Sequence, residues 1–123
     1  HKRFEIDVQS NRMGFRLKSK PIQHTIPTAL LSTAVTKGTL QLTPSGQIIV
    51  LMADHQTTGG YPRIGTVISV DLASLAQMPI GSSFGIKWVS IEEAETLLFQ
   101  QESNLQQLEN ACKFRLQEYF SEK

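Results

Sequence analysis

The stretch that decides the fold is LQLTPSGQIIVLMA, residues 40–53. Two apolar segments, residues 40–42 and 47–53, flank the four residues TPSG. Pro44 suits the second position of a type I turn, and Gly46 tolerates the positive φ that the chain needs where such a turn ends. Because the turn is short and both flanks are apolar, the stretch predicts a tight β-hairpin.

Further short strands are expected on both sides of the hairpin. The segments FEIDV (4–8) and FGIKWV (84–89) alternate apolar and polar residues, which is typical of half-buried strands. GTVISV (65–70) is rich in β-branched residues. Residues 15–17 resume extended structure after a turn or bulge at SNRMG (10–14). Regular turns between short strands favour an all-β barrel over an open sheet.

Three stretches are not predicted to be strands of this kind. Residues 18–28 contain two prolines, each of which disfavours helix at the residue before it, so we expect a loop. Residues 29–35 fit either a helical turn or an extended run. Asp71 can cap a short helix over residues 72–77.

The last part of the chain changes from strand patterns to a helical pattern. Ser90 with Glu93 three residues later is a capping box. Apolar residues then recur at helical spacings, which predicts a helix from about 91 to 119, either continuous or broken at Ser103-Asn104. Cys112 lies on the apolar face of this helix and is expected to be a core residue rather than a nucleophile.

Size and composition limit the domain organisation that the chain can have. A chain of 123 residues with 40% hydrophobic and 19% charged residues fits one soluble globular domain. We expect residues 1–90 to form the barrel and residues 91–123 to form a helical extension that packs on it, as one domain overall. The chain starts with His1 in a stretch already predicted as strand, so we expect a fragment of a longer protein.

Charge and cysteine content exclude several function classes. Residues 1–90 carry a net charge of +5 and residues 91–123 a net charge of −4, and the basic residues are scattered without interleaved aromatics. We therefore expect no nucleic-acid partner. No segment approaches about 18 consecutive apolar residues, so no membrane partner is expected. The single cysteine cannot form an internal disulfide, which suits a cytoplasmic protein.

The segment DHQTTGGYPRIGT (54–66) is the main candidate for a functional site. A loop that only turned the chain would need fewer kinds of polar side chain than this one carries. Asp54 can orient a small polar substrate or bond to loop amides, and His55 can move protons or simply be solvated. The diglycine at 59–60 permits a tight turn or a close approach to a ligand. Tyr61 can bind a ligand or pack on the rim of the barrel.

The turn SNRMG (10–14) also carries polar side chains that have either a functional or a structural role. Asn11 can cap the turn, and Arg12 can hold an anion through a bidentate contact. The alternative is a structural bulge in which Arg12 is tied to a carboxylate such as Asp54. The three histidines lie far apart in the sequence and have no paired cysteines, so no metal site is expected.

These polar segments together resemble the carboxyltransferase-type family. The resemblance rests on SNRMGFRL (10–17), on the segment from TLQLTPSGQ (39–47) through DHQTTGGYPRIGT to Phe84, and on WVSIEEA (88–94). It covers about residues 5–95. The family includes allophanate hydrolase subunit 2-like proteins, KipA-like antagonists, the subunit of bacterial 5-oxoprolinase designated C, and the matching domain of urea carboxylase.

The resemblance implies a fold, a partner and a choice of functions. The fold would be a cyclophilin-like β-barrel, here with a short helix and a C-terminal helix. The partner would be a sister subunit of related cyclophilin-like fold. We expect a subunit of an ATP-dependent amide-hydrolysing complex, with 5-oxoprolinase, which opens 5-oxoproline to glutamate, as the first choice. The alternatives are a non-catalytic module that antagonises a sporulation-kinase inhibitor, and a biotin-dependent carboxyltransferase domain acting on urea or a related amide.

The resemblance also assigns site residues. At these matched positions we hypothesise that Asp54 and Tyr61 are catalytic and, with Gln56, bind a small amide substrate near the barrel mouth. Arg12 would hold its carboxylate or a carboxyl or phosphoryl intermediate. Backbone amides of the diglycine would approach the reacting oxygen. Gly14 and Pro62 match the family pattern as well. The expected substrate-binding residues are Asn11, Arg12, Gln56, Thr57, Thr58, Gly59 and Gly60.

Cofactors are expected from outside this chain. ATP would be used by the complex but not bound by this fragment alone, because neither a GxxxxGK[ST] loop nor a GxGxxG motif is present. The chain has no Met-Lys-Met biotin-attachment sequence. A cyclophilin-like barrel does not imply prolyl isomerase activity, because a fold does not fix a function.

Overall fold

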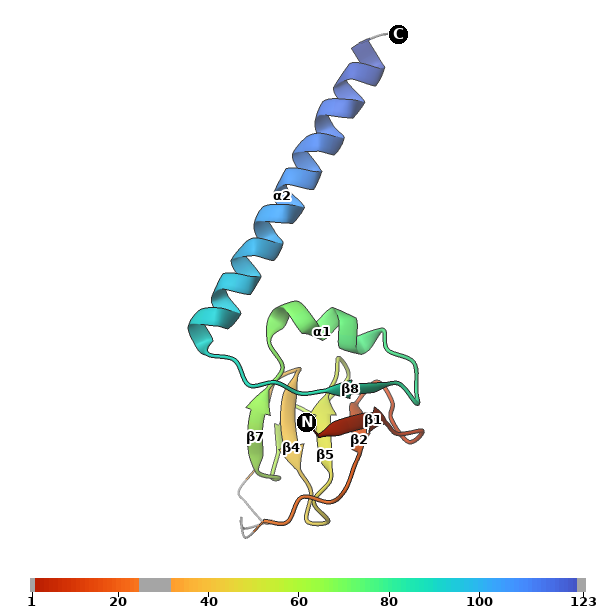
Figure 1. The fold of residues 1–123 in the computed structure, drawn as a ribbon, viewed down its shortest axis with the longest axis vertical. Helices are drawn as coiled ribbons and strands as arrows, with labels where there is room; N and C mark the ends of the chain where they lie inside the picture. The colour runs from red at the N-terminus through yellow and green to blue at the C-terminus, as the bar shows by residue number, and fades with distance from the viewer. Residues whose placement is uncertain (1, 25–31, 122–123) are drawn as a thin grey trace. The chain divides into compact units, whose positions relative to one another are not determined.

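The computed structural model describes residues 2–24 and 32–121 (Figure 1). The chain forms two compact units, His1–Trp88 and Val89–Lys123. The first unit contains the strands and a short helix, and the second contains one long helix.

An antiparallel sheet of six strands builds the first unit. The strand order is β7-β4-β5-β2-β1-β8, and each neighbouring pair runs antiparallel. The helix α1 spans Ser69–Ala76. The predicted all-β body with a short helix is therefore confirmed. The six strands are β1 (Arg3–Ile6), β2 (Gly14–Lys18), β4 (Thr39–Leu42), β5 (Ile48–Leu51), β7 (Arg63–Thr66) and β8 (Ser83–Gly85).

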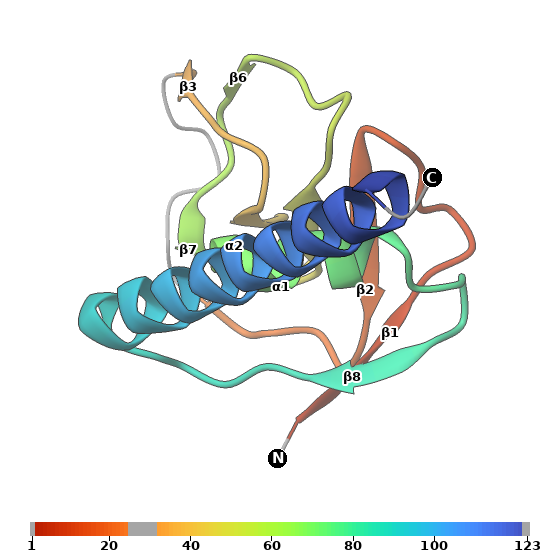
Figure 2. The same ribbon diagram turned by 90° about the horizontal axis from the view of Figure 1, so that it is seen from above.

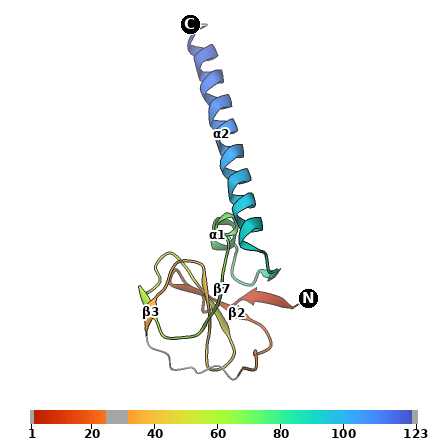
Figure 3. The same ribbon diagram turned by 90° about the vertical axis from the view of Figure 1, so that its left-hand side faces the viewer.

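A separate two-stranded sheet, which we call the β3–β6 ribbon, consists of β3 (Thr33–Ala34) and β6 (Thr58–Gly59). The backbone N–H of Val35 extends the pairing by donating to the carbonyl oxygen of Thr57 at 3.1 Å. The ribbon lies on the side of the unit away from the start of β1 (Figure 2 and Figure 3). Strands of two residues are too short to produce a periodic sequence signal, so β6 was not predicted, and β3 falls where an extended run was one of two alternatives.

The predicted hairpin is confirmed. Strands β4 and β5 pair with Leu42 opposite Ile48. Gly46 has a φ of 83°, in the left-handed region that glycine adopts readily. The backbone N–H of Thr43 donates to the carbonyl oxygen of Gln47 at 2.9 Å and closes the turn. The local turn chemistry therefore fixes the register of the two central strands.

One face of the six-stranded sheet forms the core. Leu17 of β2 is completely buried, and Leu75 of α1 joins the same apolar cluster. Because side chains alternate between the faces of a strand, the intervening residues Arg16, Gln41 and Ile49 lie on the opposite face. The core cluster consists of Phe4, Ile6, Leu17, Leu40, Leu42, Ile48, Val50, Met52 and Leu75.

The start of α1 differs from the prediction. The strand expected over 65–70 ends at Thr66, and the helix begins at Ser69. Ile68 rather than Asp71 occupies the N-cap, and Asp71 lies in the first turn, where its charge complements the helix dipole. Residues 69 and 70 therefore belong to the helix, although β-branched residues in this segment favour strand locally.

Two other strands are shorter than predicted. Strand β8 covers residues 83–85 rather than 84–89, because its pairing with β1 spans Arg3 to Glu5. Strand β1 ends at Ile6, and the carboxylate of Asp7 accepts a bond from the N–H of Gln9 at 2.9 Å, which turns the chain.

Part of the predicted loop and of the ambiguous stretch lies outside the described residues, which omit 25–31. Within the described part, β2 continues to Lys18, one residue into the expected loop. The extended alternative for 29–35 holds at Thr33–Ala34, which form β3.

The second unit is the helix α2 (Ile91–Ser121). It begins where predicted, because Oγ of Ser90 accepts a bond from the N–H of Glu93 at 3.1 Å. The helix is continuous through Ser103-Asn104, so the alternative with a break is wrong. None of its described residues is buried, and Cys112 is exposed rather than in a core, because a single helix has no interior of its own. Its packing on the first unit stays a prediction.

No helix within residues 2–24 and 32–121 combines the length and the apolarity that crossing a bilayer requires.

Candidate functional site

The two polar turns predicted from the sequence lie side by side. The backbone N–H of Asp54 donates to the carbonyl oxygen of Arg12 at 2.9 Å, and that of Met52 donates to Met13 at 3.1 Å. Nε of Arg12 lies 2.9 Å from Oδ2 of Asp54, with the two side chains 83% and 54% exposed. The structural alternative, in which Arg12 is tied to the carboxylate of Asp54, is thus the arrangement found.

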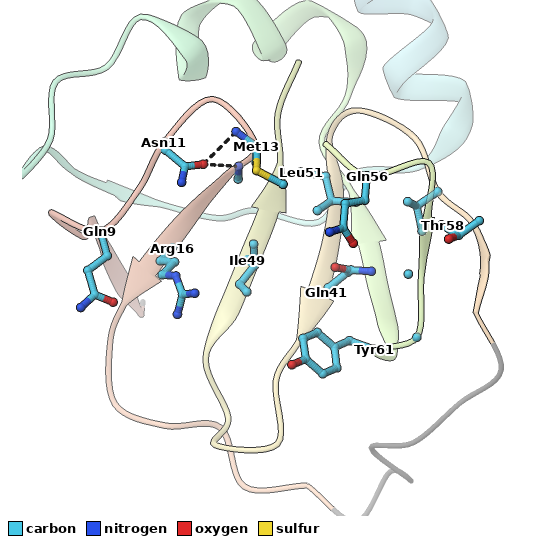
Figure 4. Close-up of a pocket in the computed structure, with 14 residues that line it drawn as sticks. Gln9, Asn11, Met13, Arg16, Gln41, Ile49, Leu51, Gln56, Thr58 and Tyr61 are labelled. Atoms are coloured by element: carbon cyan, nitrogen blue, oxygen red, sulfur yellow. Dashed lines mark hydrogen bonds between the residues drawn. The ribbon is translucent and has the colours of Figure 1, made fainter. Parts of the chain in front are cut away.

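Asn11 has a structural task in the first turn. Its Oδ1 accepts bonds from the N–H groups of Met13 at 2.8 Å and of Gly14 at 3.3 Å (Figure 4). Such a side-chain acceptor satisfies backbone donors that the turn leaves free. Asn11 therefore holds the turn in shape from the position expected of a capping residue.

A pocket of about 600 Å³ opens beside these turns. Its lining combines residues of β2, β4, β5 and the β3–β6 ribbon with residues of both polar turns (Figure 4). This volume suits a small-molecule ligand. The lining residues are Gln9, Asn11, Met13, Gly14, Arg16, Val35, Gln41, Ile49, Leu51, Gln56, Thr58, Gly59, Gly60 and Tyr61.

The pocket brings together most of the predicted site residues. Those that line it are Asn11, Gln56, Thr58, Gly59, Gly60 and Tyr61, together with Gly14.

Three predicted site residues, Arg12, Asp54 and Thr57, do not line the pocket. Arg12 and Asp54 pair with each other, and Thr57 contributes its carbonyl oxygen to the ribbon. Pro62 is buried, and its carbonyl oxygen accepts a bond from Leu42. No observation assigns a catalytic role, so the roles of Asp54 and Tyr61 stay predictions.

Sequence reasoning missed the polar residues that the strands contribute. Arg16 of β2 and Gln41 of β4 both pair with Ile49 of β5, so the three form a row across adjacent strands. Figure 4 shows Ile49 between the other two side chains. The available signal was the alternation itself, since a polar residue between two core leucines must face away from the core.

Gln41 differs from the other polar residues of the pocket because it is buried, with 6% of its surface exposed. A Cβ built on Gly59 would clash with Nε2 of Gln41, so the ribbon backbone lies directly against the amide. Glycine at position 59 therefore leaves the space that the Gln41 side chain occupies.

The described residues contain no metal-binding cluster of histidine, cysteine and carboxylate side chains. Nε2 of His24 lies 3.3 Å from the carbonyl oxygen of Thr43, and Nδ1 of His55 lies 2.6 Å from that of Gln56. His1 lies outside the described residues. Both described histidines thus contact backbone rather than each other.

Comparison with known proteins gives a consistent set of matches. The family model described as carboxyltransferase domain, subdomain A and B, matches residues 1–88, which is also the span of the first unit. Two relatives are named as the 5-oxoprolinase subunit designated C. The one from Haemophilus influenzae is 45% identical over 108 residues, and the one from Escherichia coli is 42% identical over 105 residues.

These matches cover 86% and 85% of this chain but 35% and 34% of the two relatives. The chain therefore spans about a third of the length of the curated relatives it matches. Among solved structures, crystal structures of TTHA0988 superpose with TM-scores of 0.58 and 0.57 at 29% sequence identity. Each covers 70% of this chain and 17% of the other chain.

Proposed function

The chain belongs to the family of the carboxyltransferase domain, subdomain A and B, and on that premise we propose that it is part of a 5-oxoprolinase subunit. Its relatives at 45% and 42% identity are named as a subunit of 5-oxoprolinase, which supports this choice among the activities that the family resemblance implies. The proposed complex is a cytoplasmic, multi-subunit assembly in which a sister subunit of related fold completes the active site.

The observation that carries the proposal is the pocket beside the two polar turns. Six of the nine residues expected at the site from the family resemblance line this one cavity of about 600 Å³. The proposed substrate, 5-oxoproline, is a five-membered lactam with a carboxylate and fits a pocket of this size. Its hydrolysis adds water across the ring C–N bond and yields glutamate.

Within this proposal the residues divide by position. Tyr61 and Gln56 line the pocket, where they can hydrogen-bond to a lactam. The backbone amides of Gly59 and Gly60 can approach the lactam oxygen, on which negative charge develops during hydrolysis. Asp54 lies in the adjoining turn, where its pairing with Arg12 fixes the start of the loop that carries Gln56 and the residues after it.

ATP is proposed as a co-substrate of the complex rather than as a ligand of this pocket. Among the described residues that line the pocket, Arg16 is the one with a formal charge. A triphosphate is normally neutralised by several cationic or metal-bound groups. The lining does not fit that ligand, so the proposal assigns the nucleotide to a partner subunit.

The test is ATP-dependent conversion of 5-oxoproline to glutamate by the full-length protein reconstituted with its partner subunits. Tyr61→Phe and Asp54→Asn are each compared with the wild type, and Tyr119→Phe is the matched tyrosine control on α2. We expect turnover to fall at least tenfold in Tyr61→Phe, which loses the phenol hydroxyl in the pocket, and in Asp54→Asn, which loses the charge that positions the loop, and to be unchanged in the control. Thermal unfolding of each variant separates lost chemistry from lost structure.

The other outcomes select among the alternatives. A stable complex without turnover of 5-oxoproline would refute the proposal and favour either a binding module or carboxyl transfer to another amide. Transfer would then be measured with carrier protein whose biotin has been carboxylated, since the carboxyl group must leave carboxybiotin for a urea nitrogen. Wild-type turnover that neither variant reduces would keep the substrate and exclude both residues from the reaction.

A further inference from the structure

The side chain of Gln41 is buried but has no hydrogen-bond partner among the described residues. It is 94% buried, and it is absent from every side-chain hydrogen bond found in residues 2–24 and 32–121. Its amide atoms are not sealed off either, because Nδ1 of His24 is the one fully enclosed, unpaired side-chain polar atom in the described chain. The amide therefore reaches the pocket, where water or a ligand supplies the hydrogen bonds that such a group requires.

The surroundings of Gln41 explain why it is buried and where it points. It lies on the face of β4 opposite the core, and the β3–β6 ribbon covers it through Gly59. Figure 4 shows its amide directed into the pocket, in the neighbourhood of Gln56 and Tyr61. The position therefore offers a buried donor and acceptor to whatever enters the cavity.

Arg16 lies in the same row across the sheet. It pairs with Ile49 on β5, which in turn pairs with Gln41 on β4. Two strand spacings place the Cα atoms of Arg16 and Gln41 about 10 Å apart. Arg16 lines the pocket and forms no ion pair within the described residues. A guanidinium without a carboxylate partner is available to a ligand anion.

We propose that Gln41 and Arg16 recognise the substrate at two points, the amide of Gln41 bonding to its lactam and the guanidinium of Arg16 to its carboxylate. The pocket then selects a small cyclic amide that also carries an acid. This inference rests on the proposed function, since it takes the pocket as the substrate site. It assigns the carboxylate to Arg16 on the sheet rather than to Arg12 in the turn, whose charge Asp54 already neutralises.

Three ring compounds of similar size separate the two contacts. 5-Oxoproline offers both groups, 2-pyrrolidone offers the lactam alone, and cyclopentanecarboxylate offers the acid alone. A site built to hydrogen-bond a group rejects the analogue that lacks it. We expect the full-length protein with its partner subunits to bind 5-oxoproline at least tenfold more tightly than either analogue, as measured by titration calorimetry.

Variants then assign each contact to a residue. Gln41→Met keeps the volume of the side chain but removes the amide. It should lower the affinity for 5-oxoproline about tenfold and leave that for cyclopentanecarboxylate unchanged. Arg16→Met should lower the affinity for 5-oxoproline about 10- to 100-fold and leave that for 2-pyrrolidone unchanged. Gln77→Met and Arg3→Met, which lie outside the pocket lining, are the matched controls.

The outcomes distinguish this inference from the proposed function. If the wild type turns over 5-oxoproline and both pocket variants keep full affinity for it, the two-point contact is wrong and the function stands. If Gln41→Met weakens all three ligands equally, Gln41 has a structural role and the inference fails. If the wild type binds none of the three, both proposals fail. Should Gln41→Met not fold, equal wild-type affinities for the three ligands would overturn the inference.

Discussion

Two polar pairs in the first unit differ in their surroundings. Arg12 and Asp54, the turn pair, are exposed and satisfy each other through an ion pair of 2.9 Å. The strand pair, buried Gln41 and exposed Arg16, lines the pocket from the sheet, and neither side chain has a hydrogen bond or ion pair among the described residues. An exposed ion pair joins the two turns but contributes little to stability. Polar groups that line the pocket without a protein partner remain available to a ligand.

The largest effect on stability is expected where the sheet faces its core. Leu17 follows Arg16 on β2 and is completely buried. Leu17→Ala should lower the free energy of unfolding by about 2–5 kcal/mol, because it leaves a cavity. Arg16→Met should change it by no more than about 0.5 kcal/mol. Urea denaturation of both variants checks the division of β2 into a core side and a pocket side, and equal losses would contradict it.

The next largest effect is expected at Gly59, where the ribbon backbone lies against Gln41. Gly59→Val should push the Gln41 amide from its position, lowering the free energy of unfolding by about 1–3 kcal/mol and weakening calorimetric binding of 5-oxoproline by at least the roughly tenfold expected when the amide contact is lost. Gly85→Ala is the control, because a Cβ there would meet nothing within 4 Å. Normal binding by Gly59→Val would show that the strand pair does not depend on this contact.

Local chemistry explains how much of the fold the sequence could predict. The hairpin followed from Pro44 and Gly46 between two apolar segments, because turn type and alternation depend on near neighbours. The start of α1 did not follow, since residues 67–70 favour strand locally whereas the helix already begins at Ser69. The β3–β6 ribbon joins Thr33–Ala34 to Thr58–Gly59 across a long separation that no local pattern records.

The same reasoning separates the predictable from the unpredictable parts of the site. The polar turns were identified because Asn11 and residues 54–61 are unusual for loops that only reverse the chain. Gln41 was missed because a polar residue between Leu40 and Leu42 fits a solvent-facing strand position equally well. Its burial arises from the ribbon that covers it, so it required the three-dimensional structure.

A smaller effect on stability is expected at Asn11, in the turn of residues 10–14 that contains Arg12. Asn11→Ala removes the acceptor for the N–H groups of Met13 and Gly14. It should lower the free energy of unfolding by about 1 kcal/mol, as loss of a capping side chain does. Asn11→Asp keeps an acceptor and should be closer to the wild type in urea denaturation. If the aspartate variant is destabilised as much as the alanine variant, the amide nitrogen has an additional role.

The smallest effect on stability is expected for the turn pair itself. Because both side chains are largely exposed, a double-mutant cycle with Arg12→Met and Asp54→Asn should give a coupling energy of about 0–1 kcal/mol. The coupling should shrink in about 1 M salt, where the Debye length is about 3 Å. A coupling above about 2 kcal/mol that salt does not reduce would mean that the pair behaves as a buried one. A small coupling together with a large loss of turnover in Asp54→Asn would separate the two roles of this carboxylate, since the reaction would then need it although the fold does not.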